Sequence, residues 1–591
     1  MPKLANHRWE VLCLTKKKTL KRLLSYLSES KYQLVLALFT ALIANLLALY
    51  APKVVGQAID AIGVKNNVDF MAVYKYAIIL LIMYLVSSLF LYILQRLLII
   101  VSNRITYRLR KEIFDHLQDL PISYFDQNQT GDIISKISYD VDTINTSLST
   151  DILHLFTGFI TAVGSFVMMF MISNTLVIVV LVTVPVVFYI AKLRMHKVKP
   201  LFRLRSRKLG ELNGFSEEML SGAKTIKAYG QEDTMIAKYD EKDIEASDAY
   251  YNADYQGSIL GPSINGINNL SLSLISMFGT ILFVQGKLSI GAISSFVMYS
   301  RKFAGPINET AGIITEIQTA ITAAERVFRL LDESVEKEDD TAAIELTDIK
   351  GEVRFDHVSF GYDPKTRIIF DLNLQIAPGK LFAIVGPTGA GKTTIINLLM
   401  RFYDVDEGQI FIDDIPINMI KRQSLRQAFA MVLQESWLFE GTIAENVAYA
   451  NMEATTEEII NVCKKAHIHN YIDNLPDGYN TILTDNAVNL SKGQKQLLTI
   501  ARAMLSPAKM LILDEATSNV DSNTEIQIQK AMLELMKDKT SFVIAHRLST
   551  IKTADQILVL DHGKVIETGN HDELIRAKGF YANLFNAQFT Q

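Results

Sequence analysis

The sequence predicts a membrane-embedded all-α domain of six transmembrane helices with long cytoplasmic extensions, fused to a soluble α/β domain with a phosphate-binding loop. Composition is the first indication, because 49% of the 591 residues are hydrophobic and the mean hydropathy is positive. The long apolar runs lie in the first half, whereas the second half alternates apolar and charged residues, as soluble α/β domains do. The second half also carries a G-x-x-x-x-G-K-[ST] pattern.

These patterns divide the chain into four parts. They are a cytoplasmic N-terminal segment at 1–32, a transmembrane domain at 33–320, a linker at 321–350 and a soluble domain at 351–591. The linker contains the acidic run "ESVEKEDDTAAIELTDIK", which has no helical periodicity. The soluble domain begins at "GEVRFDHVSF", whose alternation predicts a strand.

Charge and cysteine content exclude several classes of protein. The formal net charge of −4 is too small to indicate a nucleic-acid partner. The two cysteines, Cys13 and Cys463, are far apart and outside any metal-like spacing. We therefore expect no disulfide framework and no zinc site, which fits exposure to a reducing cytosol.

Six apolar stretches are long enough to cross a bilayer, which takes about 20 residues of helix. One such stretch could be a buried core helix, but six within half a chain favour a membrane domain. They lie at about 33–52, 76–100, 153–172, 175–194, 264–284 and 291–312.

The distribution of basic residues predicts the orientation of these helices. The connections after the second and fourth spans are rich in lysine and arginine. By contrast, the third and fourth spans meet at Ser173-Asn174 without charge, and the fifth and sixth are joined by a segment with one lysine. Both termini and the two basic connections are therefore expected in the cytoplasm.

The two basic connections are predicted to continue the spanning helices beyond the membrane. They are about 50 and 70 residues long, rich in helix formers and poor in helix breakers. Each pair of extensions would end in a short turn segment, near 139–146 and 227–234. Such arms could transmit force to the soluble domain, although plain solvated helices are the alternative.

The stretch "AIVGPTGAGKTT" reads as a strand that leads through a glycine-rich loop into a helix. Small residues let backbone amides surround phosphates at the positive end of that helix. Lys392 is expected to neutralise the β- and γ-phosphates, and Thr393 to hold Mg²⁺. The expected ATP-binding residues of this loop are Gly386, Thr388, Gly389, Gly391, Lys392, Thr393 and Thr394.

Two carboxylates end the apolar strand in "KMLILDE". An apolar run of this kind is typical of a buried parallel strand, and ligands bind at the carboxyl ends of such strands. Asp514 is therefore expected to help hold Mg²⁺, and Glu515 to orient and deprotonate the attacking water. An exposed acidic strand end is the plainer alternative, which the intact phosphate loop disfavours.

Over nearly its whole length the chain resembles the ABC exporters in their half-transporter form. The resemblance implies that Tyr362 in "FGYDP" stacks on adenine, although packing on the sheet is the alternative for this ring. It implies that Gln434 in "MVLQESWLF" is a Mg²⁺ ligand and a sensor of the membrane domain. His546 in "IAHRLST" would contact the γ-phosphate, and "SNVD", ending at Asp521, resembles the D-loop. In the membrane half, "LPISYFDQNQTGDIISKISYDVD" and "TIKAYGQED" resemble the cytoplasmic loops that carry coupling helices.

The resemblance also implies a dimer in which each ATP lies between one subunit's phosphate loop and the partner's signature motif. The signature here is "LSKGQ", whose expected γ-phosphate contacts are Ser491, Gly493 and Gln494. Lys492 replaces the first glycine of the family pattern. This resembles heterodimeric bacterial exporters, in which one subunit keeps the catalytic glutamate and its paralogous partner has lost it but supplies the better signature. A homodimer in which Lys492 is a harmless variant is the alternative.

The spans themselves do not name a substrate. They are mostly Leu, Ile, Val, Met and Phe, which favours export of hydrophobic or amphipathic, drug-like compounds across a bacterial cytoplasmic membrane. Arg301, Lys302 and Glu309 either line a polar cavity or lie near an interface. The alternatives are a lipid flippase of the same fold and a regulatory protein that uses ATP to gate a membrane conformation without pumping.

Overall fold

A computed structural model describes residues 18–63, 68–363, 365–434, 436–484, 490–514, 521–544 and 548–589. The chain divides into two compact units. The helical unit comprises Met1–Gln118 and Thr130–Glu333, and the α/β unit comprises Asp119–Gln129 and Ser334–Gln591. Each unit is described by itself.

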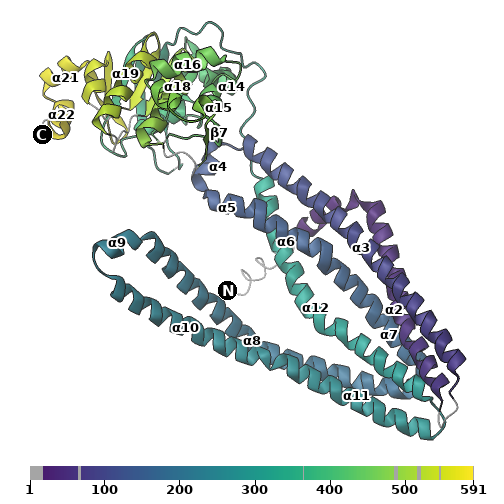
Figure 1. Cartoon of the computed structure of the whole chain (residues 1–591). Coiled ribbons are helices and arrows are strands. Elements are labelled where there is room, and N and C mark those ends of the chain that lie inside the picture. The colour runs from purple at the N-terminus through teal and green to yellow at the C-terminus, as the bar shows by residue number, and fades with distance from the viewer. Residues whose placement is uncertain are drawn as a thin grey trace. The chain divides into compact units, whose positions relative to one another are not determined.

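Long helices form the helical unit (Figure 1). A short helix over 18–28 comes first. The elements that follow are α2 (Lys31–Ile62), α3 (Phe70–Asp119), α5 (Thr130–Ser135), η1 (Lys136–Asp140), α6 (Val141–Thr146), η2 (Ser147–Asp151), α7 (Ile152–Ile172), α8 (Asn174–Ser221), α9 (Ala223–Ala228), α10 (Glu232–Ser258), α11 (Leu260–Val284) and α12 (Ile290–Leu331).

The two basic connections are helical, as the sequence predicts, but the first predicted turn segment is wrong. Residues 139–146 are helical, in η1 and α6, and the chain instead leaves the helix at 120–121 and 128–129, on either side of α4 (Ile122–Gln127). In the second predicted turn segment, residues 229–230 form a turn between α9 and α10. The 50 residues of α3 and the 48 residues of α8 each run without a break from an apolar segment into a charged one. Helices α8 and α10 lie side by side with α9 at their end (Figure 1).

In the part of the chain that the structure describes, five helical segments are long and apolar enough to cross a membrane. These are Lys31–Ile62, Phe70–Asp119, Thr130–Ile172, Asn174–Ser221 and Glu232–Val284. Helix α12, where the sixth span is predicted, is not among them. Arg301 and Lys302 interrupt its apolar run, which lowers its mean hydropathy.

Helices α2 and α12 are joined by hydrogen bonds at predicted membrane depth. Pro52 inside α2 has no N–H, so the carbonyl of Ala48, four residues earlier, loses its helical donor. Lys302 Nζ of α12 donates to that carbonyl at 2.5 Å, and Tyr299 Oη donates to Leu49 O at 2.7 Å. The ammonium group of Lys302 therefore replaces the backbone N–H donor that the carbonyl of Ala48 lacks because of Pro52.

The same two helices approach closely at a pair of glycines. A Cβ atom on Gly291 would lie 1.9 Å from the carbonyl oxygen of Gly56, so neither position has room for a side chain. One turn away, Asp60 of α2 accepts hydrogen bonds from Gly291 N at 2.7 Å and from Ser289 Oγ at 2.7 Å.

Two sheets build the α/β unit. The smaller sheet has the order β2-β1-β4-β5 and is antiparallel, with β1 (Val353–Phe360), β2 (Ile369–Ile376), β4 (Glu407–Ile412) and β5 (Ile415–Pro416). The larger sheet has the order β12-β11-β3-β10-β9-β6, with β3 (Leu381–Val385), β6 (Phe429–Val432), β9 (Met510–Asp514), β10 (Thr540–Ile544), β11 (Gln556–Asp561) and β12 (Lys564–Gly569). All neighbours in the larger sheet are parallel except β11 and β12.

The parallel strands of the larger sheet are largely buried on both faces, which explains their apolar sequences, whereas the antiparallel edge strand β12 is partly exposed. In β3, Phe382 and Ile384 contribute to one hydrophobic core, and Ala383 and Val385 contribute to another.

The remaining elements of the α/β unit are mainly helices. They include α4 (Ile122–Gln127), α13 (Lys392–Leu399), α14 (Arg422–Gln427), α15 (Ile443–Ala448), α16 (Thr456–Lys465), α17 (His469–Asp473), α18 (Lys492–Leu505), α19 (Ser522–Met536), α20 (Leu548–Thr553), α21 (His571–Ala577) and α22 (Phe580–Phe589), with the short pair β7 (Gly441–Thr442) and β8 (Ile482–Leu483).

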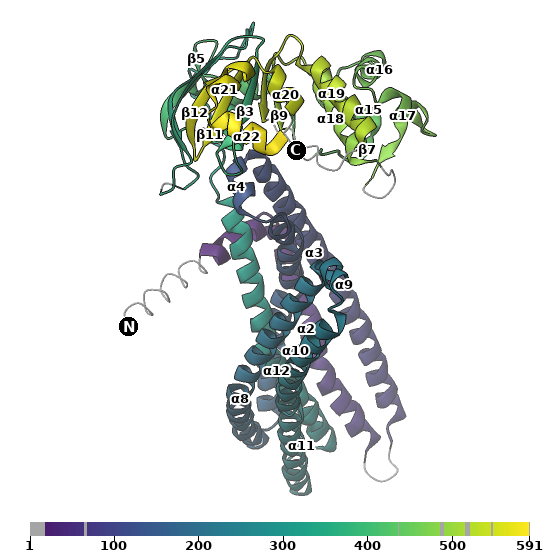
Figure 2. The same cartoon turned by 90° about the vertical axis from the view of Figure 1, so that its left-hand side faces the viewer.

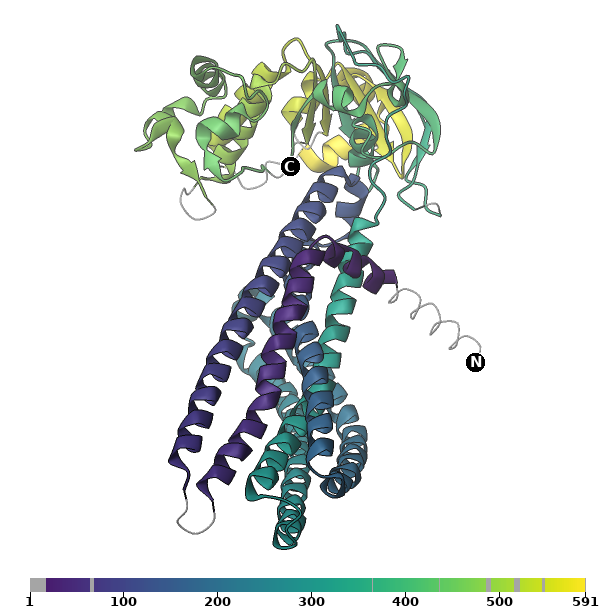
Figure 3. The same cartoon turned by 90° about the vertical axis from the view of Figure 1, so that its right-hand side faces the viewer.

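Helices α15–α18 lie to one side of the sheets within this unit (Figures 2 and 3). The signature helix α18 packs against β6, and its buried residues share one hydrophobic core with Ala383 and Val385 of β3.

The acidic segment after α12 is held by arginines of the α/β unit. Asp339 accepts from Arg422 Nη1 at 2.9 Å and faces Arg401 Nη1 at 3.4 Å, and both arginines are buried. Glu336 pairs with Arg426 Nη2 at 2.5 Å. Residues that the sequence assigns to a linker are thus ordered here by three arginines.

Candidate functional site

The predicted ATP-site residues lie at the carboxyl ends of neighbouring parallel strands. Asp514 is the last residue of β9, Gln434 follows β6 by two residues, and the phosphate loop follows β3. Strands β6, β9, β10 and β3 are adjacent in that order. Of the three predicted catalytic residues, Gln434 is described, whereas Glu515 and His546 lie outside the described residues. In the sequence they follow β9 and β10, whose ends border the same edge.

The phosphate loop has a backbone that only glycine fits at Gly391. This residue is the N-cap of α13 with a φ of 100°, and its Cβ atom would lie 2.7 Å from Ile369 Cδ1. A Cβ atom on Gly386 would lie 2.2 Å from the carbonyl oxygen of Leu560. The loop is therefore packed closely against β11 and β2.

Lys392 is the buried first residue of α13. Its Nζ donates to the carbonyl oxygens of Gly386 at 2.8 Å and Pro387 at 2.9 Å. Burial lowers the pKa of Lys392, while the nearby carboxylate of Asp514 raises it. An anion at this loop would meet a desolvated ammonium group and the positive end of a helix, which suits phosphate.

The phosphate loop and the start of α13 also carry three threonines. Thr388 and Thr393 are exposed, whereas Thr394 is buried; Gly389 has a φ of 83°. Magnesium prefers hydroxyl, carboxylate and phosphate oxygens. The exposed Thr393 hydroxyl, the Asp514 carboxylate and the exposed Gln434 amide are oxygen donors of the required kind.

Tyr362 is anchored by two aromatic neighbours and still presents surface beside the phosphate loop. Its ring meets Tyr403 edge-on at 4.8 Å and Phe360 at 5.1 Å between centroids. Its hydroxyl accepts from Asn397 Nδ2 at 3.0 Å and donates to Thr394 Oγ1 at 3.4 Å, and both partners belong to α13. Because 43% of the residue is exposed, the ring is packed and also available to stack on a base.

A short helix of the first predicted cytoplasmic loop belongs to the α/β unit. Helix α4 lies within "LPISYFDQNQ", one of the predicted coupling segments. Tyr403 donates its hydroxyl hydrogen to Asp126 Oδ2 of α4 at 2.5 Å. Burial and this carboxylate together raise the pKa of Tyr403 above its ordinary value. The other predicted coupling segment contains α9, which lies between α8 and α10 in the helical unit.

Sequence reasoning missed Tyr403 and Asn397. No motif marks them, since Asn397 lies inside an apolar helix and Tyr403 follows it in "RFYD". The spacing of three residues between Thr394 and Asn397, which places both on one face of α13, is the available signal for Asn397, and Tyr403 lies beyond the end of that helix.

The signature segment forms the start of α18. Ser491 is the N-cap, and it forms a capping box with Gln494: Ser491 Oγ accepts from Gln494 N at 3.2 Å, and Ser491 N donates to Gln494 Oε1 at 2.8 Å. Gly493 is buried. Lys492 is an exposed first helical residue, so its backbone is one that any amino acid adopts. The lysine therefore changes charge at this helix N-terminus without straining it.

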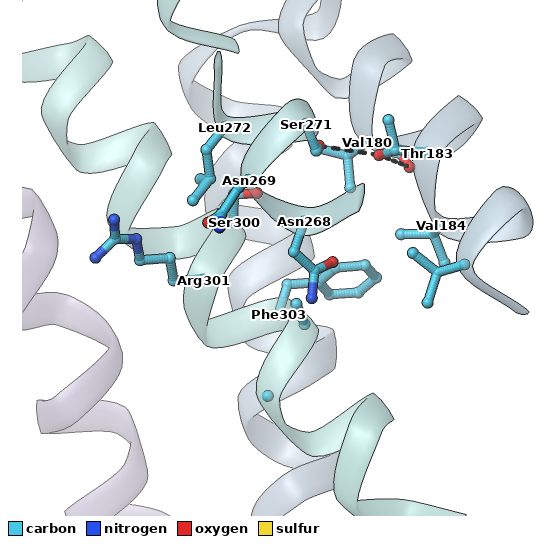
Figure 4. Close-up of a pocket in the computed structure, with 13 residues that line it drawn as sticks. Val180, Thr183, Val184, Asn268, Asn269, Ser271, Leu272, Ser300, Arg301 and Phe303 are labelled. Atoms are coloured by element: carbon cyan, nitrogen blue, oxygen red, sulfur yellow. Dashed lines mark hydrogen bonds between the residues drawn. The ribbon is translucent and has the colours of Figure 1, made fainter. Parts of the chain in front are cut away.

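The charged residues of the sixth predicted span have different surroundings. Lys302 is bonded to Ala48 of α2, as described above, and Glu309 is exposed. Arg301 lines a pocket between α8, α11 and α12 (Figure 4).

Comparisons with known proteins cover both units. A family model described as ABC transporter transmembrane region matches residues 34–307, and one described as ABC transporter matches residues 369–518. The uncharacterized ABC transporter ATP-binding protein YfiC of Bacillus subtilis is 41% identical, over 97% of this chain and 94% of the relative. A fatty acid ABC transporter ATP-binding/permease protein of Mycobacterium tuberculosis is 41% identical, over 88% of this chain and 82% of the relative.

Two further matches extend over almost all of the chain. A putative multidrug export ATP-binding/permease protein of Staphylococcus aureus is 33% identical, over 96% of this chain and 100% of the relative. A solved structure of a bacterial Atm1-family ABC exporter with ATP bound is 29% identical, with a TM-score of 0.74 over 95% of this chain and 99% of that chain. These matches confirm the predicted fold, in which a helical transmembrane domain with long helices is fused to an α/β ATPase domain.

Proposed function

Because the chain belongs to the ABC transporters, as an exporter half-transporter with one transmembrane domain and one ATPase domain, we propose that it exports hydrophobic or amphipathic, drug-like compounds. ATP hydrolysis is coupled to transport, and ABC half-transporters act as dimers. The observation that carries the proposed substrate class is the relative named for putative multidrug export, which matches 96% of this chain. The apolar composition of the spans is consistent with it.

In the proposed cycle, ATP binds with its base on Tyr362 and its phosphates around Lys392. Bound ATP would supply the phosphate oxygens that complete a Mg²⁺ site with Thr393, Gln434 and Asp514. The amides of Gly386, Thr388, Gly389 and Gly391 and the side chain of Thr394 would surround the phosphates of the ATP that this subunit binds. Ser491, Gly493 and Gln494 of this chain would contact the γ-phosphate of the ATP that the partner binds.

Hydrolysis is assigned to Glu515 as the base that orients and deprotonates water, with His546 at the γ-phosphate. We expect Glu515→Gln to remove most ATPase activity, by about 100-fold or more, while ATP binding persists. Phosphate release and binding of a fluorescent ATP analogue measure the two effects. Glu457→Gln, an exposed change in α16, is the control and should retain activity. Turnover that survives Glu515→Gln would reject this assignment.

We also propose that the partner is a different, paralogous half-transporter. The support is Lys492, which places a cation in the signature that this chain lends to its partner's ATP. In such a heterodimer, one site hydrolyses ATP and the other mainly holds it. A homodimer is the alternative. Mass spectrometry of the tagged chain, purified from its native membrane, distinguishes the two by the presence or absence of a stoichiometric second half-transporter.

A lipid-like substrate is the second candidate. Its specific support is the fatty acid ABC transporter relative, which is 41% identical to this chain. ATP-dependent uptake of a hydrophobic dye and of a labelled fatty acid into inside-out vesicles compares the two classes directly. ATPase activity without flux of either probe would favour a regulatory protein that gates a membrane conformation.

A further inference from the structure

Arg502 of the signature helix α18 holds the segment that follows Gln434 in the chain, residues 436–440. Its Nη1 donates to Trp437 O at 3.0 Å. Its Nε donates to Asn446 O at 2.8 Å, and its Nη2 donates to Asn446 Oδ1 at 3.1 Å. One guanidinium group therefore bonds both to this segment and to α15, which lies beside α18 (Figures 2 and 3).

Residues 436–440 form neither helix nor strand, so their position depends on contacts of this kind. Asn446 is buried; its Nδ2 donates to Phe439 O at 2.9 Å, and its Oδ1 accepts from Phe439 N at 2.8 Å. The rings of Phe439 and Tyr449 stack at 4.7 Å between centroids. Arg502 Cζ lies 5.9 Å from the first centroid and 5.4 Å from the second. The segment, α15 and α18 are therefore joined in one network with Arg502 at its centre.

The partners of Arg502 are neutral in the part of the chain that the structure describes. They are two backbone carbonyls, one side-chain amide and two rings. These contacts fix positions rather than neutralise a carboxylate. A guanidinium group suits this task because its planar fork offers several N–H donors in a fixed arrangement, which lysine lacks.

The two ends of this network belong to different ATP sites of the proposed dimer. At one end, Gln434 is a proposed Mg²⁺ ligand of the ATP that this subunit binds. At the other end, α18 has Ser491 as its N-cap, and Ser491 would contact the ATP that the partner binds. A helix of 14 residues moves as one unit, because backbone hydrogen bonds join each turn to the next. Arg502 and Ser491 are therefore expected to move together.

We propose that Arg502 is a positioning residue that links the two ATP sites: it transmits movement of residues 436–440 to the signature that this chain presents to its partner's ATP. When Gln434 moves to bind Mg²⁺, the segment behind it shifts, and α18 follows because Arg502 bonds to the segment's backbone. This inference rests on the proposed dimer and adds a route between its ATP sites that runs within one chain.

Two fluorescent reporters in the native assembly test this link, one at each end. The chain has two tryptophans, Trp9 and Trp437. In a Trp9→Phe background, the difference between assemblies that carry Trp437 and those with Trp437→Phe gives the emission of Trp437 alone. A bimane group on Lys495→Cys, an exposed position of α18, reports the signature helix in a Cys13→Ser background. Assemblies without Lys495→Cys are the blank for labelling elsewhere.

Mg²⁺ with a non-hydrolysable ATP analogue should shift both signals in the chain that keeps Arg502. Arg502→Gln should keep the Trp437 response and lose most of the bimane response. Arg502→Lys keeps the charge without the planar fork, so it should retain only part of the bimane response. A full bimane response in either variant would overturn the inference, and Arg502→Lys decides the question if Arg502→Gln does not fold.

The matched control is Arg354→Gln in β1 of the smaller sheet. Arg354 is also partly buried and lies over a ring, since its Cζ is 3.9 Å from the centroid of Phe411. Its ion pairs with Asp356 and Asp414 do not involve α18, so both responses should persist in this variant. Loss of the bimane response in both Arg354→Gln and Arg502→Gln would reject Arg502 as the specific link.

Release of the labelled analogue measures the consequence for the partner's ATP. When unlabelled analogue is added in excess, Arg502→Gln should speed the slowest phase of release by about tenfold, the scale of one hydrogen bond to a charged group. Unchanged release would overturn the link between the two sites.

Failure of this inference and failure of the proposed function give different results. If both reporters respond in Arg502→Gln but ATP-driven dye uptake continues, the link is wrong and the exporter proposal stands. If neither dye nor fatty acid moves under ATP while the reporters separate as expected, the proposed export is wrong and the link stands.

Discussion

Gly391 fixes the shape of the phosphate loop through one backbone angle. Its φ of 100° lies in a region that residues with side chains rarely adopt, and Ile369 occupies the space a Cβ atom would need. The same residue caps α13, so loop shape and helix start depend on one position.

We expect Gly391→Ala to destabilise the α/β unit by about 1–3 kcal/mol, the usual cost of a strained backbone conformation, and to abolish tight ATP binding. Thermal unfolding and fluorescent-nucleotide binding measure the two effects. Gly214→Ala is the control, because this helical position of α8 has open space around it and should gain up to about 1 kcal/mol. Wild-type nucleotide affinity in Gly391→Ala would show that the loop tolerates a side chain.

Cys463 illustrates how burial decides the reactivity of a residue. Burial raises the pKa of its thiol to about 12, so the thiol remains protonated at neutral pH and the reactive thiolate is scarce. In a Cys13→Ser background, we expect maleimide to label the folded protein slowly and the denatured protein rapidly. Raising the pH by about two units should leave the folded protein slow to react, because the solution is still below the raised pKa. Rapid labelling under native conditions would contradict the burial of this helix.

At the scale of elements, the segment after α12 is ordered by ion pairs between its carboxylates and arginines of the α/β unit, although its sequence is typical of an acidic linker. Its position depends on arginines more than 60 residues further along the chain. Local pattern could not reveal that contact, because acidic runs without helical periodicity are typical of solvated linkers.

We expect Asp339→Ala to destabilise the α/β unit by about 3 kcal/mol, the lower end of the range for removing one partner of a buried ion pair, since Asp404 remains near both arginines. Glu345→Ala in the same segment is the matched control. Glu345 pairs with Lys421 at 2.8 Å on the surface, where such pairs contribute about 0–1 kcal/mol. Chemical unfolding followed by tryptophan fluorescence compares the variants; equal effects would mean that the buried arginines do not need Asp339.

Helix α4 is the second element whose role depends on a distant contact. Tyr403 joins it to the ring of Tyr362 and, through that ring, to the helix that follows the phosphate loop. We expect Tyr403→Phe to keep the ring packing and ATP affinity but to lower the amount of dye transported per ATP hydrolysed. Phe360→Leu, which changes the same ring cluster without touching α4, is the control. If Tyr403→Phe transports a normal amount of dye per ATP hydrolysed, the hydrogen bond to Asp126 does not couple ATP hydrolysis to transport.

Most of the architecture of the whole molecule could be predicted from local patterns. Apolar runs predicted the long helices, and the strand-loop-helix around Lys392 predicted the nucleotide site, because each signal lies within about 20 consecutive residues. The contacts of Tyr403 with Asp126 and of Lys302 with Ala48 could not be predicted in this way. They join residues 277 and 254 positions apart, and only the folded chain brings them together.

The composition of the dimer also decides the effect of Lys492. In the proposed heterodimer, the partner lacks a catalytic glutamate, so Lys492→Gly should leave ATP turnover of the assembly nearly unchanged. In a homodimer, the substitution would restore the family signature at both hydrolytic sites and raise turnover. ATPase assays on the native assembly measure this difference, with Lys495→Gly, an exposed change one turn along α18, as the control for helix stability. A clear increase in turnover would count against the heterodimer.

The contact between α2 and α12 limits how this transporter can change shape. Separating these helices would strand an ammonium group, a phenol and the carbonyl groups around Pro52 in the hydrocarbon, where polar groups without partners are costly. The close fit of Gly56 against Gly291 also leaves no room for sliding. We therefore expect α2 and α12 to move together as one rigid body. The change between inward-facing and outward-facing states then has to come from hinges elsewhere in the membrane domain.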